Sequence, residues 1–297
     1  MFPERPPCGF LVLAKPAGLS SHACVAQARR CYGLRRVGHG GTLDPAVTGV
    51  LPLAIGPATR LLPYLPGEKT YEGVIQLGVR TSSDDLEGEL LEQRQPPPLD
   101  LSAIEQHLDA FRGPILQCPP QVSAVHVAGE RAYVRVRRGE TLELPPRPVT
   151  IHSLELLAWD PSAARLTLRL HCSAGTYVRS LARDLGERLG CGAALAQLQR
   201  TSALGFQLEQ AVPLEALEKA PPPPLIDPLH ALAHLPRHSL SAEALPLWRC
   251  GQAQPGEGQL ASGSAVVVVA PDGNLAGMAC VGEHGVLQPR LVLEAAG

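Results

Sequence analysis

Residues 38–53, with the sequence GHGGTLDPAVTGVLPL, place an Asp-Pro pair between a glycine-rich segment and an apolar run. The glycines ahead of Asp44 permit backbone conformations and close approaches that a Cβ would forbid. Pro45 disfavours the α region for the residue before it, so Asp44 is expected to be extended. The stretch predicts a carboxylate on a tight, exposed turn, followed by a strand over 49–55. Pro52 inside that strand predicts a sheet edge or a bulge.

Three interpretations of the Asp44 turn are open from these residues. A glycine-rich turn can cradle phosphate, but the lysine and hydroxyl of a G-x-x-x-x-G-K-[ST] loop are absent. An Asp-Pro pair also commonly caps a helix that begins at the proline. The third role is nucleophilic catalysis, because carboxylates attack sugar carbons in known enzymes. The rest of the chain has to decide among them.

Composition limits the class of protein. The 297 residues, 45% of them hydrophobic, suffice for one large domain, alone or with a small partner domain. No apolar run reaches the roughly 20 residues of a membrane span, and residues 1–7 lack the apolar core of a signal peptide, so a cytoplasmic protein is expected. The eight cysteines are scattered without a C-x-x-C pair, which argues against a zinc site and against a disulfide framework.

The charges are unevenly distributed. A net charge of −2 does not by itself indicate a nucleic-acid partner. However, residues 29–36 and 131–138 each hold four arginines and no acid, whereas acids concentrate in residues 84–92. The two basic segments could bind phosphates, or they could simply be solvated charged faces.

Hydrophobic periodicity predicts both strands and helices in the first two thirds of the chain. Residues 112–148, rich in proline, glycine and arginine, predict instead a long irregular loop of the kind that is usually functional. Arg179 would lie in the first turn of a helix, where a cation opposes the helix dipole, so a carboxylate partner is expected. The expected strands are 9–14, 49–55, 69–79, 149–158 and 166–172, and the expected helices run from Ser20 or Ser21 to Gly33, over 101–111 with Leu101 facing inward, and over 176–189.

The C-terminal part of the chain has a different pattern. Pro221–Pro224 predicts a rigid linker. Beyond it, a short helix is expected at 241–249, followed by short strands at 266–270, 275–281 and 286–293 that are joined by Asp-Gly and His-Gly turns. This pattern is typical of a small β-barrel or sandwich.

Several segments together resemble the TruB family, the bacterial tRNA pseudouridine-55 synthases. Residues 38–53 are similar to its G-H-x-G-x-L-D-P-x-A-T-G-x-L-P signature, with a slightly different order at 46–49, and Lys15-Pro16 begins a match to its K-P-x-G-x-(S/T)-S start. Residues 175–186 match G-T-Y-x-R-(S/T)-L-x-x-D-L-G, and Leu198-Gln199-Arg200-Thr201 follows. Within the loop 112–148, Ser123-Ala124 and Gly129…Ala132-Tyr133 match the family, whereas Val122 and His126 stand where tyrosine and lysine are expected.

The resemblance implies an α+β catalytic domain over residues 1–220, with a mixed, mainly antiparallel sheet, flanking helices and a central cleft. Residues 112–148 would form an insertion that grips RNA, 221–235 a proline-rich linker, and 236–297 a β-barrel-like domain of the PUA type that binds RNA. The implied reaction is isomerisation of the uridine at position 55 of the tRNA T-loop to pseudouridine, after the nucleotide is flipped out. The protein would act on tRNA as a cytoplasmic monomer, without a membrane, a metal or a cofactor.

The resemblance also implies roles for individual residues. Asp44 would be the nucleophile, and Arg179 would pair with it through a two-pronged contact that keeps it ionised. Tyr71 would stack on the uracil and pass the C5 proton. Tyr177 and Leu198 would line the same pocket.

Further residues are expected to contact the substrate around that pocket. His39, at the rim of the Asp44 loop, would fill the gap that the flipped base leaves in the RNA. Lys15 would touch a phosphate or support the loop. Arg135, Arg137 and Arg138 would bind the RNA backbone.

Two rival functions use the same residues differently. A two-carboxylate glycosidase would need a second acid beside Asp44, drawn from Asp184 or from residues 84–92. A non-catalytic tRNA-binding or RNA-folding protein could be built on the same scaffold. The second rival is disfavoured, because binding to an anionic polymer does not require a carboxylate facing it.

Overall fold

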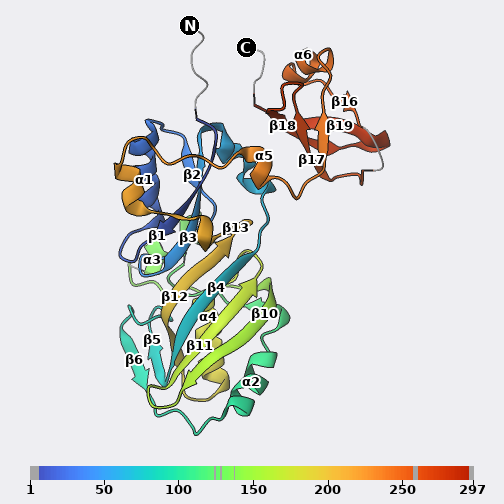
Figure 1. Ribbon diagram of the computed structural model, residues 1–297. Helices are drawn as coiled ribbons and strands as arrows, with labels where there is room; N and C mark the ends of the chain where they lie inside the picture. The colour runs from blue at the N-terminus through green and yellow to red at the C-terminus, as the bar shows by residue number, and fades with distance from the viewer. Residues whose placement is uncertain (1–6, 124, 128, 137, 257–259, 294–297) are drawn as a thin grey trace.

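The computed structural model describes residues 7–123, 125–127, 129–136, 138–256 and 260–293 (Figure 1). In these ranges ten strands form the main sheet, in the order β14-β1-β3-β12-β4-β11-β10-β7, with β13 beside β12 and β2 beside β3. Pairing is antiparallel except between β1 and β14 and between β3 and β12. The expected mixed, mainly antiparallel sheet is therefore confirmed. Its strands are β1 (Gly9–Lys15), β2 (Val37–His39), β3 (Thr48–Ile55), β4 (Lys69–Leu77), β7 (Gly113–Gln117), β10 (Arg147–Asp160), β11 (Arg165–Cys172), β12 (Ala193–Ala203), β13 (Phe206–Gln207) and β14 (Val212–Pro213).

Three α-helices pack on one face of this sheet. They are α1 (Ser21–Tyr32), α2 (Leu101–Asp109) and α4 (Val178–Arg188). Val25 of α1, Ile104 of α2 and Leu185 of α4 share one core with the strand residues Leu53 and Ile75. Burying apolar side chains of these elements together is the main force that holds the helices on the sheet.

Side-chain caps fix where two of these helices begin. Ser20 caps α1 by accepting a hydrogen bond from the Ala23 amide, and Asp100 caps α2 through the Ala103 amide. Leu101, which was expected to face inward, is instead 61% exposed, because the buried stripe of α2 begins at Ile104. Gly33 ends α1 in a left-handed conformation, as predicted.

The long strand β12 joins the two halves of the sheet, and the sequence did not indicate it. It pairs antiparallel with β4, where Leu198 lies opposite Gly73 and Arg200 opposite Tyr71, and parallel with β3, where Arg200 lies opposite Gly49. The strand is largely Ala, Leu and Gln, residue types without a strong β preference. Its extended form follows from pairing on both sides.

Pro52 lies in an internal strand, so the expected sheet edge is wrong. β3 pairs with β1 over residues 49–55, with Pro52 opposite Val12. On its other side it pairs with β12 only at residues 48–49 and with β2 only at 53–55. The Pro52 carbonyl points to that side, where it accepts a hydrogen bond from the Gly40 amide. The proline therefore sits where no ladder needs its missing N–H.

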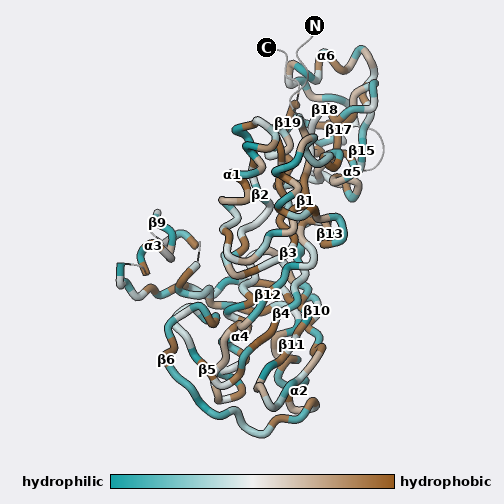
Figure 2. Tube along the Cα trace, turned by 60° about the vertical axis from the view of Figure 1, so that its left-hand side comes forward, coloured by the Kyte–Doolittle hydropathy of each residue, from teal (hydrophilic) through white to brown (hydrophobic). Residues whose placement is uncertain are grey.

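The expected loop over 112–148 is partly regular. Residues 113–117 form β7, an edge strand on β10, where Pro114 is tolerated. Beyond it lie β8 (His126–Val127), β9 (Glu130–Arg131) and the short helix α3 (Ala132–Val136). Figure 2 shows β9 and α3 projecting from the main body of the protein.

A second, five-stranded sheet forms the C-terminal unit, shown in orange and red in Figure 1. Its order is β15-β17-β18-β19-β16, as expected for a small β-rich unit, and Trp248 is buried in its core. Val267, Met278 and Leu291 pack with Phe10 and Val12, on the face of the main sheet opposite α1. Its elements are β15 (Arg237–Ser239), α6 (Ala244–Arg249), β16 (Gln254–Pro255), β17 (Ala265–Val269), β18 (Leu275–Val281) and β19 (Val286–Val292).

The segment 221–235 runs back along the main sheet. Ile226 and Phe10 exchange two backbone hydrogen bonds of 2.7 and 2.9 Å, and α5 (Pro228–Ala231) follows. The remaining short elements are the 3-10 segments η1 (Gly56–Tyr64), η2 (Leu208–Gln210), η3 (Leu214–Glu218) and η4 (Glu283–Gly285), and the strand pair β5 (Val79–Thr81) and β6 (Leu90–Gln93). Within the described residues, no helix has the length and apolar character that a membrane crossing requires.

Candidate active site

The Asp44 loop is held from beneath by buried polar groups. The Lys15 ammonium, whose residue is 1% exposed, donates hydrogen bonds to the carbonyls of Pro45 and Pro16 at 3.0 and 2.8 Å. The Ser21 hydroxyl bonds both the amide and the carbonyl of Leu43. No helix begins at Pro45 in this described part of the chain, so the helix-cap interpretation of Asp44 is wrong. The loop instead presents the Asp44 carboxylate, which is 46% exposed, outward from a fixed backbone.

Arg179 has the carboxylate partner that its position in the first turn of α4 predicted, and that partner is Asp44. Its Nη2 lies 2.8 Å from Oδ2 of Asp44 and 3.0 Å from the carbonyl oxygen of Val122. Its Nη1 donates to the Ser83 carbonyl at 3.0 Å and lies 3.6 Å from the Asp85 carboxylate. The contact to Asp44 thus uses one oxygen, and the expected two-pronged geometry is not present. The guanidinium is shared between two carboxylates, which offset its unfavourable place at a helix N-terminus.

Asp44 opens on a cavity of about 290 Å³ in the middle of the main sheet. Its walls come from the Asp44 loop, from β4 and β12, and from the start of α4. Five of the site residues predicted from the sequence line this cavity: Asp44, Tyr71, Tyr177, Arg179 and Leu198. The other side chains that matter below are Lys69, Ser123 and Arg200. The expected central cleft is therefore present, and it contains the predicted set of reactive groups.

Tyr71 forms part of the cavity wall from β4 and is 7% exposed. Burial raises the pKa of its phenol, and the guanidinium of Arg200 on the neighbouring strand opposes that rise. The phenol is therefore neutral at physiological pH and can donate or relay a proton. Its buried ring offers an apolar face to a planar ligand.

Tyr177 enters the cavity from the residue before α4. The side-chain amide of Gln117 accepts from the Tyr177 amide at 2.8 Å and donates to the Tyr177 carbonyl at 3.1 Å. These two bonds satisfy the backbone at the start of the helix, where Tyr177 itself makes no side-chain cap. Burial raises the pKa of the Tyr177 phenol, which is therefore neutral as well. Leu198 lies on β12 and is partly buried.

His39 and Lys15 do not line the cavity. His39, on β2, accepts a hydrogen bond at Nδ1 from the Gly41 amide at 3.3 Å, and its burial lowers its pKa, so the ring is neutral. The Lys15 ammonium is buried against two carbonyls and out of reach of a phosphate in this structure. Of the two roles considered for Lys15, support of the loop is the one its contacts fit.

Two arginines of the insertion, Arg135 and Arg138, are paired with acids nearby in the chain. Arg135 contacts Glu140 at 2.6 Å, and Arg138 contacts Glu130 at 3.0 Å. Arg137 lies outside the described residues. The segment 131–138 has no acid of its own, but Glu130 and Glu140 flank it, and the structure brings them back onto it.

Sequence reasoning missed Lys69, Asp85, Ser123 and Arg200. Arg200 was part of a quoted motif, yet no role was given to it, because a single arginine on an unrecognised strand carries no signal of burial. Asp85 was one of the acids in 84–92, and only the fold brings it to Arg179. Asp184 instead pairs with Arg183 at 2.8 Å and does not line the cavity.

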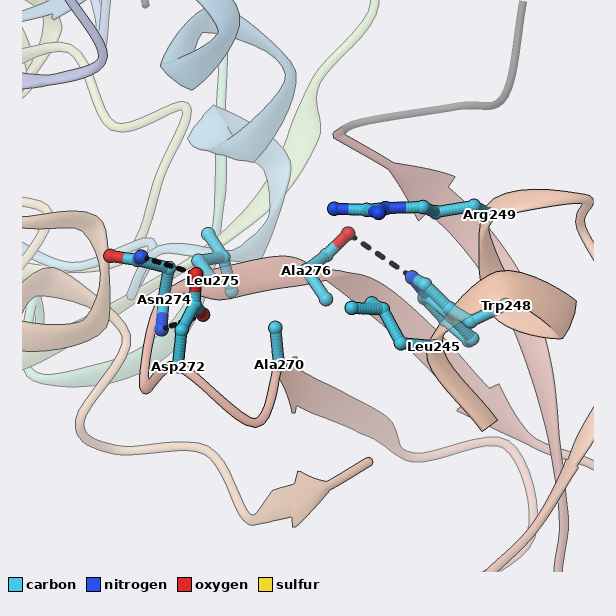
Figure 3. Close-up of a pocket in the computed structure, with 8 residues that line it drawn as sticks. All are labelled: Leu245, Trp248, Arg249, Ala270, Asp272, Asn274, Leu275 and Ala276. Carbon is cyan, nitrogen blue, oxygen red and sulfur yellow. Dashed lines mark hydrogen bonds between the residues drawn. The ribbon is translucent and has the colours of Figure 1, made fainter. Parts of the chain in front are cut away.

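The hollow in the C-terminal unit is too small to rival this cavity. It lies between α6 and the β17–β18 turn and encloses about 10 Å³ (Figure 3). Trp248 closes one side by donating from Nε1 to the Ala276 carbonyl at 3.1 Å, and Asp272 bonds Asn274 on the other. About one water molecule would fit there. Among the described residues, no group of three or more His, Cys, Asp or Glu side chains is placed to hold a metal ion.

Comparison with known proteins agrees with this geometry. Residues 29–178 match the family described as "TruB family pseudouridylate synthase (N terminal domain)", and residues 179–221 match "tRNA pseudouridylate synthase B C-terminal domain". The chain is 63% identical to tRNA pseudouridine synthase B of Parasynechococcus marenigrum over 98% of its length and 99% of that protein. It is 58% identical to tRNA pseudouridine synthase B of a Synechococcus species, over the same shares of the two chains.

A solved structure is similar along almost the whole chain. It is described as the "Crystal Structure of a Cbf5-Nop10-Gar1 Complex", and it matches with a TM-score of 0.73 and 26% identity, over 97% of this chain and 85% of that one. The likeness includes the C-terminal unit, because so little of the chain lies outside the matched part.

Proposed function

The chain belongs to the TruB family of pseudouridylate synthases, and on that basis we propose that it isomerises the uridine at position 55 of the tRNA T-loop, with Asp44 as the nucleophile. The observation that carries the proposal is the placement of Asp44 at the edge of the cavity, on a rigid loop and 2.8 Å from Arg179. A fixed carboxylate, paired with an arginine and beside a pocket of nucleoside size, is what attack on a sugar or base carbon requires.

The other walls of the cavity fit the remaining steps. The reaction breaks the bond between C1′ and N1, turns the uracil, and joins C1′ to C5, while the C5 hydrogen leaves as a proton and N1 gains one. The buried ring of Tyr71 would stack on the uracil, and its neutral phenol would pass the proton. Tyr177 and Leu198 would keep water from the separated base.

A uridine within a folded loop reaches this cavity only when it is flipped out of its stack. His39 adjoins Gly41 on the Asp44 loop, and its ring is neutral. A neutral ring can take the place of the extruded base without bringing a charge into the RNA. We assign His39 this role.

The RNA would contact the insertion and the C-terminal unit as well as the cavity. Arg135 lies in α3, which projects from the body with β9 (Figure 2), and this is a suitable position for gripping a stem. Arg138 follows closely in the chain, and the proposal includes Arg137, which lies outside the described residues. The C-terminal unit, assigned here as a PUA-type domain over 236–297 after a linker at 221–235, would hold the rest of the tRNA. We expect the protein to act as a monomer in the cytoplasm, without a metal or a cofactor.

Replacing Asp44 with Asn tests the proposal most directly. Tritium release from C5-labelled uridine in a T-stem-loop should fall to background in Asp44→Asn, while affinity for the stem-loop is largely kept. Asp184→Asn is a matched control, because it removes an acid outside the cavity, and it should retain turnover. Full activity in Asp44→Asn would defeat the assignment. Binding without turnover by the native chain on any tRNA would support an RNA-folding protein instead.

A further inference from the structure

Two cationic side chains in the active-site cavity are left without an acidic partner. Among the described residues, neither Lys69 nor Arg200 forms an ion pair, and the Lys69 ammonium makes no hydrogen bond. The other two arginines nearby differ sharply from them. Arg179 contacts Asp44 and Asp85, and Arg183 contacts Asp84 and Asp184.

Arg200 is fully buried and incompletely bonded. Its Nε donates to the Val50 carbonyl at 2.8 Å and its Nη2 to the Gly41 carbonyl at 3.1 Å. The Tyr71 phenol also interacts with the guanidinium, and the buried Nη1 makes no hydrogen bond of ordinary geometry. A buried cationic N–H without a partner is costly, and such groups commonly mark a site that a ligand completes.

Lys69 and Arg200 converge on the Gly41 backbone. A Cβ built on Gly41 would lie 3.4 Å from Cε of Lys69 and 3.5 Å from Nη1 of Arg200. Gly41 has a φ of 120°, so a residue with a side chain would also be strained there. The two cations therefore share one corner of the cavity, formed by the glycine turn and by the adjacent ends of β4 and β12.

The charges of the cavity leave room for one anion. Lys69, Arg179 and Arg200 line the cavity and supply three positive charges, and Asp44 supplies one negative charge. Asp85 lies outside the lining but contacts Arg179 at 3.6 Å, so the two carboxylates together leave a surplus of one positive charge. Uracil and ribose are neutral, so the phosphodiester is the charged group that a uridine in RNA can bring. Each phosphodiester carries one negative charge, which equals the surplus.

We propose that Lys69 and Arg200 form a subsite for a backbone phosphate adjacent to the flipped uridine. This proposal rests on the proposed function and adds a second anchoring point for the substrate. The phosphate would hold the nucleotide at the corner beside Gly41, and the sugar would then lie between that corner and Asp44. Burial and Arg200 lower the pKa of Lys69, and a bound anion would restore the preference for its charged form.

An RNA loop with one uncharged methylphosphonate linkage can show whether a lysine or arginine contacts the phosphate at that linkage, because the effect of its substitution should then disappear. Lys69→Gln is compared with Lys219→Gln, which removes an exposed lysine outside the cavity. Binding is measured in an Asp44→Asn background with a T-stem-loop, and again with loops that carry a methylphosphonate on the 5′ or the 3′ side of the target uridine. Turnover by tritium release is measured in chains that retain Asp44.

Lys69→Gln should weaken binding of the natural loop by about tenfold, because a charge-assisted hydrogen bond is lost. The slope of log affinity against log salt should fall by about 0.7, the value for one phosphate contact on a single strand. With one of the two methylphosphonate loops, Lys69→Gln and the lysine-containing protein should bind equally. Arg200→Lys, once its unfolding is shown to match that of the native protein, should likewise lose the preference for the natural loop over that methylphosphonate loop.

Two results would overturn the subsite. One is a Lys69→Gln protein that matches Lys219→Gln in affinity and salt slope. The other is a full loss of affinity that persists on both neutral-linkage loops. Measurements on the native chain keep this test distinct from that of the proposed function. If the native chain releases no tritium from the natural loop, the proposed function fails. If it releases tritium normally and Lys69→Gln changes neither affinity nor salt slope, only the subsite is ruled out.

Discussion

At the scale of single residues, the site depends on buried cationic side chains that differ in how many hydrogen bonds and ion pairs they make. The Lys15 ammonium uses two carbonyls to fix the loop that carries Asp44. Arg179 spreads its charge over two carboxylates and two carbonyls. Arg200 bonds two carbonyls and interacts with the Tyr71 phenol, but it has no acidic partner, and its buried Nη1 makes no regular hydrogen bond. The free energy lost by burying these charges is offset only where hydrogen bonds replace water, so each partner matters individually.

His39 should make the protein less stable in mild acid. Burial, with His22, Arg200 and Arg131 nearby, lowers its pKa from the usual 6.5. The unfolded chain therefore binds more protons than the folded chain just below pH 6.5, and the free energy of unfolding falls as the pH drops through that window. Above it, this contribution is constant.

Urea unfolding at several pH values between 7.5 and 5 would measure the effect of His39→Gln, which should flatten the acid dependence. His230→Gln changes an exposed histidine of α5 and should leave the dependence as it is. A wild-type dependence that survives in His39→Gln would show that other groups cause it.

At the scale of elements, the first turns of α4 tie together the two loops that border the cavity. Ser180 and Arg183 both donate to the Cys118 carbonyl, and Arg183 also contacts Asp84 at 3.0 Å. Arg179 reaches Ser83 in one loop and Val122 in the other. The helix thus fixes the start of the insertion and the loop after β5 relative to Asp44.

Gln117 is the link between β7 and α4, and removing its amide should loosen the site. Gln117→Met keeps the side-chain volume but removes the partner of the Tyr177 N–H and one of the two donors to the Tyr177 carbonyl, which still accepts from the Leu181 amide. The expected cost is about 1–3 kcal/mol in the free energy of unfolding. Urea denaturation would measure it, with Gln106→Met on the exposed side of α2 as the control. If the two variants are equally stable, the Gln117 bonds contribute nothing measurable to stability.

At the scale of the whole molecule, the charge balance is slightly negative, which does not favour an RNA substrate. The net charge is −2, and Arg138 and Arg135 of the insertion are paired with Glu130 and Glu140, respectively. RNA phosphates must therefore compete with these carboxylates. On the proposed function, we expect the projecting segment to bind phosphates by exchanging its internal ion pairs for contacts with the RNA.

Neutralising Arg135, Arg137 and Arg138 should weaken stem-loop binding and reduce its salt dependence, because fewer counterions are displaced from the RNA. The matched change on the other side of the pairs, Glu130→Gln with Glu140→Gln, should strengthen binding. Filter binding over a range of salt concentrations would measure both. An unchanged salt slope in the arginine variant would remove the insertion from the RNA footprint.

The sequence by itself determined the parts of this protein that local chemistry specifies. These are the tight turn around Asp44, the start of α1 at Ser20 or Ser21 and its end at Gly33, the strand with Tyr71, and the need of Arg179 for a carboxylate. Only the tertiary structure decided that residues 193–203 form the strand β12 and that Pro52 lies in an internal strand. It also decided that Asp85 shares Arg179 with Asp44, and that Lys69 and Arg200 meet in the cavity without an acidic partner. Turn and cap preferences arise from neighbouring residues, whereas strand pairing, burial and ion pairing depend on which distant segments the fold brings together.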